Sequence, residues 1–162
     1  MLDQIKSLVK DKGIEYFFCS FVELSGAPKA KLVPATHVDD MIRDGAGFAG
    51  FAAGDLNQGP HDPDIVSMPD LNSLAVLPWR KNVAWVPGNL HVNGQPWPYC
   101  PRTILTRQLE LARKKGYLFQ VGVEPEFMLL KKNPQGDYEP WIHSIMPPNL
   151  VMTSARSTAI ST

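Results

Sequence analysis

The first third of the chain arranges its apolar residues in short segments that predict a mixed α+β fold. Apolar positions in residues 1–12 recur at helical spacing, which predicts a helix that ends at Gly13. Residues 14–22 are aromatic and β-branched and predict a strand. Turn-forming residues 25–28 precede a second predicted strand over 30–34, so the two strands should form a hairpin.

The next segment predicts more short elements of both kinds. Thr36 is expected to cap a short helix over residues 37–43. Residues 73–79 and 82–90 predict two further strands. Asn93 and Gly94 then form an Asn-Gly pair, which is typical of a tight hairpin turn.

A proline-rich linker around residues 96–101 separates this α+β domain from the C-terminal part of the chain. Thr103 is expected to cap an amphipathic helix that ends at Gly116, and residues 117–130 predict a buried strand. We therefore expect a first domain over residues 1–98 and the start of a second over 99–141. Residues 142–162 show no periodicity and are rich in Ser, Thr and Pro, which predicts a disordered tail.

Two glutamates lie on the last predicted strand and are the main candidates for chemistry. Glu124 and Glu126 are two residues apart, so on a strand both side chains point to the same face. Two neighbouring carboxylates on a buried face repel each other, and a divalent cation such as Mg²⁺ or Mn²⁺ would offset that cost. The alternative is a strand end at which both carboxylates reach water.

Composition excludes several classes of partner. Lys+Arg and Asp+Glu both number 16, so no basic surface for nucleic acid or an anionic membrane is expected. The apolar runs are too short to span a bilayer, and the N-terminal residues do not form a signal peptide. Cys19 and Cys100 lack metal-ligand spacing and are interpreted as free thiols in the cytoplasm.

A series of segments, taken in order, resembles the glutamine synthetase family. The similarity is to its type III-like branch, which includes γ-glutamylmethylamide synthetases, and it covers residues 1–141. The segments that carry it are residues 30–34, 45–52, 64–71, 78–79, 84–86, 100–102 and 122–127. Any one of these segments alone would be a weak signal, whereas the ordered set is specific.

The resemblance implies a β-grasp domain followed by the first helix and strand of a catalytic domain. The family joins glutamate to ammonia or a small amine with ATP, through a γ-glutamyl phosphate, and it assembles as homo-oligomeric rings. Glu124 and Glu126 match the first two metal-ligand glutamates, one for each of two divalent ions, Mg²⁺ or Mn²⁺. The other ligands, the nucleotide site and the catalytic residues are absent from this sequence. The chain alone is therefore expected to bind no cofactor and to be inactive.

Two departures from the family pattern stand out. The family's Phe-Asp-Gly-Ser-Ser loop, whose aspartate helps to hold ammonium, is replaced by Phe-Ala-Gly-Phe-Ala at residues 48–52, and Asp55 nearby is not a motif match. This change suits a bulkier or less charged amine, or this branch fills the loop differently. Cys100 replaces the aspartate of the family's Asp-Pro-Arg sequence and is expected to serve packing, while Arg102 should anchor the linker through a carboxylate or carbonyl.

The tail after Trp141 does not resemble the family, and the genetic code suggests a reason. If the reading frame began one base earlier, the codons that span residues 141–142, 146–147 and 152–153 would have to encode Asp, Ala and Asp, respectively. The intervening codons permit a sequence similar to the family's. We therefore interpret residues 142–162 as a frameshifted tail on a truncated synthetase. The alternatives are a β-grasp module that assembles with a full-length synthetase, and an inert pseudogene product.

Overall fold

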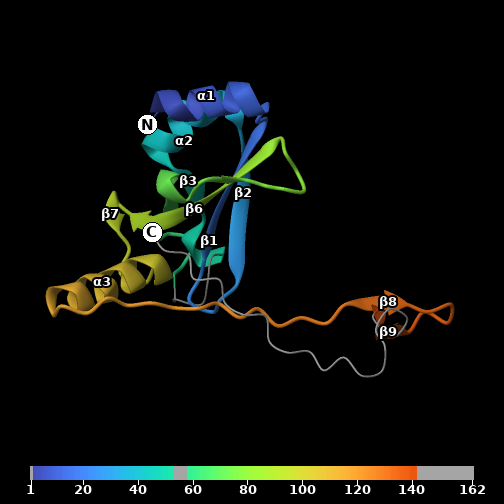
Figure 1. Ribbon diagram of the computed structural model, residues 1–162. Helices are drawn as coiled ribbons and strands as arrows, with labels where there is room; N and C mark the ends of the chain where they lie inside the picture. Colours follow the sequence, from blue (N-terminus) through green and yellow to red (C-terminus); the bar gives the residue numbers. More distant parts are fainter. Residues whose placement is uncertain (1, 53–57, 142–162) are drawn as a thin grey trace. The chain divides into compact units, whose positions relative to one another are not determined.

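Residues 2–52 and 58–141 are described by the computed structural model, in which the chain divides into two units. The first unit is Met1–Tyr117 and the second is Leu118–Thr162 (Figure 1). The predicted boundary between residues 98 and 99 falls inside the first unit. Asp55 and the tail over residues 142–162 lie outside the described residues.

The first unit begins with the predicted helix and hairpin. Helix α1 (Leu2–Lys12) ends at Gly13, whose φ of +63° is the left-handed conformation that glycine adopts most readily. Strand β1 (Tyr16–Val22) pairs antiparallel with β2 (Pro28–Pro34), so that Phe18 faces Leu32 across the ladder. These three elements confirm the sequence prediction.

The short helix is present, but its expected cap is not. Thr36 lies within a 3₁₀ turn, η1 (Ala35–His37), and helix α2 (Val38–Asp44) follows it directly. The N-cap of α2 is His37, whose side chain makes no capping hydrogen bond. The prediction for Thr36 is therefore wrong, because the chain already turns at Ala35 before the α-helix starts.

The remaining strands complete one sheet, and one of them was missed. The elements are β3 (Ala46–Phe48), η2 (Gly50–Ala52), β4 (Ile65–Pro69), η3 (Leu71–Ser73), β5 (Ala75–Val76), β6 (Val83–Val92) and β7 (Gln95–Pro96). Strand β4 is the one that was not predicted, and it precedes the segment over residues 73–79 for which a strand was expected. The strand expected over residues 73–79 shrinks to β5, because the chain turns back over residues 77–80 through the hydrogen bond from Arg80 N to Leu77 O (3.2 Å).

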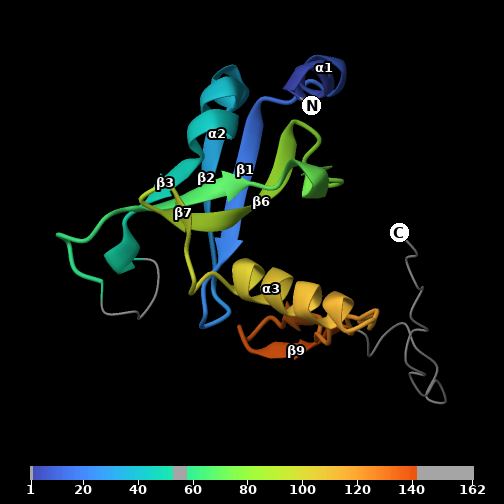
Figure 2. The ribbon, with the colours of Figure 1, turned by 90° about the vertical axis from the view of Figure 1, so that its left-hand side faces the viewer.

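The sheet has the order β2-β1-β6-β4-β3, with β5 and β7 also paired to β6 (Figure 2). The two central strands, β1 and β6, are parallel, and the other pairs are antiparallel. At the β6–β7 turn Asn93 and Gly94 both have positive φ, 51° and 73°, as the Asn-Gly pair predicted.

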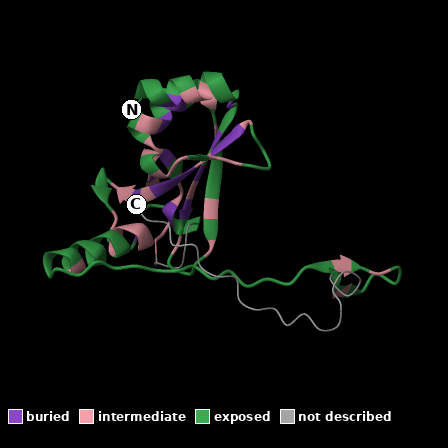
Figure 3. Cartoon of the chain, in the orientation of Figure 1, coloured by how far each residue is buried: buried purple, intermediate pink, exposed green. Residues whose placement is uncertain are grey.

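Helices α1 and α2 cover one face of this sheet. Their buried residues Ile5 and Met41 pack in one cluster with Phe17, Cys19 and Val86 of the central strands. A second cluster, formed by Phe21, Ile65, Leu90 and Cys100, lies further along the sheet. Figure 3 shows the buried residues concentrated on these strands.

Helix α3 (Pro101–Lys114) follows the linker. Its N-cap is Cys100 and proline occupies the first turn, so Thr103 lies inside the helix and is not the predicted cap. Gly116 follows the helix end with a φ of +80°. None of the α3 residues is buried, and Leu105, Leu109 and Leu111 of its apolar side are 53%, 39% and 47% exposed. None of the described helices is long and apolar enough to cross a membrane.

The second unit contains one small hairpin. Strand β8 (Leu130–Lys132) pairs antiparallel with β9 (Tyr138–Pro140), and Gly136 in the connecting turn has a φ of +92°. Before this hairpin, residues 118–129 have no regular secondary structure. The predicted strand over residues 117–130 is therefore wrong except at Leu130.

Candidate functional site

The two candidate glutamates lie in the irregular segment before β8. Glu124 and Glu126 are both exposed, and so are their apolar neighbours Val123 (84%) and Phe127 (75%). The expectation of a buried strand fails for a physical reason. A strand is stable only when its backbone N–H and C=O groups pair with a neighbour, and no described strand pairs with this segment.

The sequence of this segment still alternates as a strand would. Within residues 119–127, the even positions are Gln120, Gly122, Glu124 and Glu126, whereas the odd positions are Phe119, Val121, Val123, Pro125 and Phe127. The apolar residues Leu118 and Met128, at the two ends of this stretch, break the alternation. If a neighbouring strand paired with this segment, both carboxylates would point to one face and the apolar side chains to the other. The polar face would then present two anionic oxygen donors.

The fit of these donors to a divalent metal is partial. Carboxylate oxygens are the ligands that Mg²⁺ and Mn²⁺ prefer, so the donor type fits. Across residues 2–52 and 58–141, however, no group of three or more Asp, Glu, His or Cys side chains gathers where a metal could be held. Two carboxylates leave most of an octahedral shell to be filled from elsewhere.

Arg102 connects the start of α3 to the sheet. Its Nη2 donates to Oδ2 of Asp70 at 2.5 Å, and its Nε donates to Oδ1 of Asn89 at 3.0 Å. The predicted anchoring role of Arg102 is confirmed, with a carboxylate and an amide oxygen as its partners. Sequence reasoning missed both partners. Asp70 could have been found from the sequence, because an aspartate just before Asn72 and Ser73 is in a position typical of a helix cap. In the structure Asp70 caps η3, and its side chain accepts hydrogen bonds from Asn72 N (3.2 Å) and Ser73 Oγ (2.8 Å).

Cys100 is a packing residue, as predicted. It is 1% exposed in the cluster with Phe21, Ile65 and Leu90. Its Sγ accepts a long hydrogen bond from Leu90 N at 3.4 Å. An aspartate in this apolar position would need a stronger partner than one strand amide, which explains how a thiol replaces it here.

The Phe-Ala-Gly-Phe-Ala loop is fixed at its beginning. Phe48 packs edge-to-face on Phe21, with 4.8 Å between ring centroids. Lys31 places its ammonium 4.9 Å from the centre of the Phe48 ring and donates to Gly47 O. Lys31 was not predicted from the sequence, since a lysine on an edge strand carries no signal of its own. Beyond Phe48, Phe51 is 52% exposed.

The cysteines are not nucleophiles. Burial raises the pKa of the Cys19 thiol from 9.0 to about 11, and its Sγ lies 3.3 Å from Met41 Sδ in the core. Cys100 is equally inaccessible, so both are free, buried thiols. On the surface of α2, hydrogen bonds from His37 and Arg43 lower the pKa of Asp40, which forms an exposed network and not a cleft.

Comparison with known proteins identifies relatives over most of the chain. The family model described as "Glutamine synthetase, catalytic domain" matches residues 98–159, and so extends beyond Trp141 into the segment that we predicted to be unrelated. The chain is 44% identical over 126 residues to a glutamine synthetase of Rhizobium leguminosarum bv. phaseoli, covering 78% of this chain and 29% of the relative. It is 36% identical over 130 residues to a glutamate–methylamine ligase of Methyloversatilis universalis, covering 80% and 29%.

Solved structures agree with these relatives. A structure titled "Apo GmaS without ligand" is 46% identical to this chain, with a TM-score of 0.64, over 67% of this chain and 26% of that one. A complex of GmaS with ADP matches with 47% identity and the same TM-score. The chain thus spans roughly 30% of the length of the curated relatives that it matches.

Proposed function

Since the chain belongs to the glutamine synthetase family, we propose that it forms the N-terminal part of an ATP-dependent ligase that joins glutamate to ammonia or a small amine. The observation that carries this proposal is the 44% identity to a glutamine synthetase together with 36% identity to a glutamate–methylamine ligase. The first unit then corresponds to a β-grasp domain. Its parallel central pair, β1 and β6, with the β1–β2 hairpin at one side, supports that assignment.

Glu124 and Glu126 are the residues of this chain that would act in the reaction. Each carboxylate would hold one of two divalent ions, Mg²⁺ or Mn²⁺, with the remaining ligands supplied by the rest of the catalytic domain. Bound ions of this kind neutralise phosphate charge during phosphoryl transfer from ATP to the γ-carboxylate of glutamate. The contribution of this chain would be to place two anionic oxygens on one side of a strand, once a neighbouring strand pairs with residues 118–129.

The chain alone should lack ligase activity. Its two candidate ligands are exposed on an unpaired segment, so they cannot hold two ions at a fixed distance. For the same reason we expect weak metal binding. In a Mn²⁺ titration followed by electron paramagnetic resonance, most of the metal should stay free at micromolar concentrations. Binding that is tight in the chain and lost in Glu124→Gln would contradict this expectation.

The amine donor is either ammonia or a small alkylamine. The loop over residues 48–52 carries no acid, which favours a donor that does not need an anionic ammonium site. The relative named glutamate–methylamine ligase gives that choice independent support. Ring assembly and a cytoplasmic location are part of the same proposal.

The test uses a synthetase that contains these residues together with the rest of a catalytic domain. This protein should form γ-glutamyl amide from glutamate, ATP and either ammonia or methylamine. Glu124→Gln and Glu126→Gln should each lower kcat by at least about 10²-fold, as expected for removal of a group that stabilises charge in the transition state.

The matched control is Glu110→Gln on α3, which makes the same change at an exposed position and should leave kcat unchanged. Assembly is the second candidate function, because the apolar side of α3 and residues 118–129 are exposed. Co-purification of the chain with a full-length synthetase would support that second candidate.

A further inference from the structure

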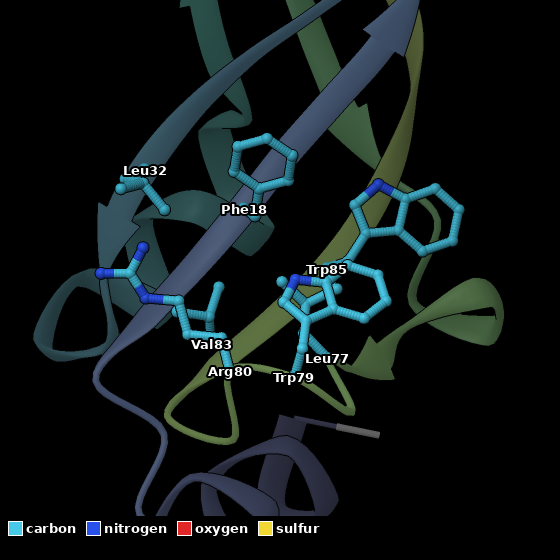
Figure 4. A pocket seen from close by; sticks show the side chains of 7 residues that line it. All are labelled: Phe18, Leu32, Leu77, Trp79, Arg80, Val83 and Trp85. Carbon is cyan, nitrogen blue, oxygen red and sulfur yellow. The ribbon is translucent and has the colours of Figure 1, made fainter. Parts of the chain in front are cut away.

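The sheet face opposite α1 and α2 carries a pocket that the proposed ligase reaction does not use. Along β1, Phe17 and Cys19 point into the core, so Phe18 between them points to the other face. The pocket on that face has a volume of about 580 Å³ and is lined almost entirely by apolar side chains (Figure 4). The lining residues are Phe18, Leu32, Leu77, Trp79, Arg80, Val83 and Trp85.

The floor of this pocket is built on three adjacent strands. Phe18 of β1 lies beside Leu32 of β2 and beside Trp85 of β6 in the strand registers. Trp85 is held in place because its Nε1 donates to Ser20 Oγ at 2.7 Å. Val83 is only 3% exposed and closes the bottom. The sheet therefore fixes an aromatic and aliphatic surface before any ligand binds.

The wall comes from the turn between β5 and β6. Leu77 N donates to Val83 O at 3.0 Å and Val83 N donates to Arg80 O at 2.9 Å, so the turn is closed at its base. This geometry places Trp79 and Arg80 at the rim, as Figure 4 shows. Trp79 is 79% exposed, which is unusual for so large an apolar side chain.

Arg80 is the one charged residue in the lining, and it has no ion-pair partner among the described residues. The positive charge of this guanidinium beside the aromatic rings disfavours a cationic ligand and favours a ligand with a carboxylate. The two oxygens of a carboxylate match the planar arrangement of N–H donors on the guanidinium. The cavity volume lies within the range of small-molecule sites, roughly 300–1,000 Å³. Arg80 is exposed to solvent, so water hydrates its guanidinium in the free protein and a bound carboxylate would replace that water.

We propose that this pocket binds a small aromatic carboxylate, with its ring against Trp85, Phe18 and Trp79 and its carboxylate on Arg80. The proposal concerns only the first unit of the chain. It therefore stands or falls independently of the ligase activity and of Glu124 and Glu126.

The test uses the full chain labelled with ¹⁵N and titrated with indole-3-propionate. The four tryptophans give separate indole N–H signals in a ¹⁵N–¹H correlation spectrum. The signals of Trp79 and Trp85 should shift and saturate, whereas those of Trp97 and Trp141, which do not line the pocket, should not move. Indole-3-propionamide has the same shape without the charge and should bind about fivefold more weakly, the upper end for an exposed ion pair.

Substitutions separate the two parts of the site. Arg80→Gln should weaken the acid about fivefold and leave the amide unchanged. Trp79→Ala should weaken both ligands up to about tenfold through the loss of ring contact. The matched control is Lys81→Gln, which removes the neighbouring exposed cation outside the lining and should change neither affinity.

Three results would overturn the proposal. The first is no saturable shift at millimolar ligand. The second is equal affinity for the acid and the amide in the unsubstituted chain. The third is concentration-dependent broadening of the Trp79 and Trp85 signals without ligand, with dimers in sedimentation velocity, which would make this face a contact between copies of the chain.

Discussion

Arg102 Nη2 lies 2.5 Å from Asp70 Oδ2, and this ion pair joins the first turn of α3 to the loop after β4. Because Asn89 on β6 accepts a second bond from the same guanidinium, one side chain connects the helix to two separate parts of the sheet. Arg102 thereby fixes the place at which α3 leaves the sheet.

Arg102→Met should lower the free energy of unfolding by about 1 kcal/mol. The side chains of Arg102 and Asp70 are 39% and 22% exposed, so solvent screening reduces the strength of the ion pair. Urea unfolding followed by circular dichroism measures the change, and Arg107→Met on the exposed side of α3 is the control. A double-mutant cycle with Asp70→Asn should give a coupling energy above zero. A coupling energy of zero would contradict the ion pair between Arg102 and Asp70.

Gly88→Ala should destabilise the sheet by about 1–3 kcal/mol, the range for overpacking. A Cβ at residue 88 would overlap Ser67 Oγ and lie 3.0 Å from Met68 O on the neighbouring strand. Ser67 is 2% exposed and its hydroxyl has no hydrogen-bond partner among the described residues. Ser67→Ala alone should therefore be neutral or slightly stabilising.

The double variant Ser67→Ala/Gly88→Ala makes this prediction specific. Removing the hydroxyl should recover part of the loss, although Ser67 Cβ at 3.1 Å from the added atom remains a close contact. Thermal and urea unfolding of all four proteins test it. Strictly additive effects would show that the steric conflict lies elsewhere.

Ionisation of the Cys19 thiol should lower the free energy of unfolding in alkaline solution. Its pKa rises from 9.0 to about 11 on burial, so the unfolded chain loses this proton at lower pH than the folded one. The stability linked to the protonated thiol is complete below pH 9.0 and is lost as the pH rises to about 11. The loss is at most on the order of 2–3 kcal/mol.

The measurement compares the pH dependence of unfolding free energy in the unsubstituted protein and in Cys19→Ala. Lysines and tyrosines titrate in the same range, so the difference between the two curves isolates the thiol. The variant should show a flatter decline above pH 9.0, even though it starts from a lower stability because it leaves a small cavity in the core. Parallel curves would exclude the burial effect.

The apolar side of α3 should promote self-association of the chain. Leu105 and Leu109 are exposed and one helical turn apart, so they present a continuous apolar strip. Leu109→Lys should lower light scattering during concentration of the protein. Gln108→Lys adds the same charge at the adjacent exposed position and should have a smaller effect. An equal decrease in both variants would indicate net charge as the cause.

Local sequence signals predicted the first hairpin and both helices that flank it. Residues 14–22 and 30–34 needed only β-branched and aromatic composition and a turn between them, and these are short-range properties. The Asn93-Gly94 turn was predictable for the same reason. The N-caps of the helices were not predictable in this way: Thr36 and Thr103 are good caps by type, but the backbone had already turned at Ala35 and at Pro101.

The candidate site exposed the limit of pattern reasoning. The composition of residues 117–130 is that of a strand, yet a strand forms only where a neighbouring strand completes its hydrogen bonds. Pattern analysis predicted that Glu124 and Glu126 share one face of a strand, and this stays a prediction because residues 118–129 form no strand in this structure. It could not supply the partners, which depend on contacts remote in sequence. The pairing of Arg102 with Asp70 likewise depended on the fold.

The parallel pairing of β1 with β6 has a consequence for synthesis of the protein on the ribosome. Contacts such as Trp85 to Ser20 join residues 65 apart in the chain, so the central ladder closes only after β6 has emerged. Until then the nascent hairpin exposes Phe17, Cys19 and Phe21 to solvent and to chaperones. Such high contact order slows folding and lengthens this period. All of the sequence between the two strands must therefore be translated before β1 can pair with β6.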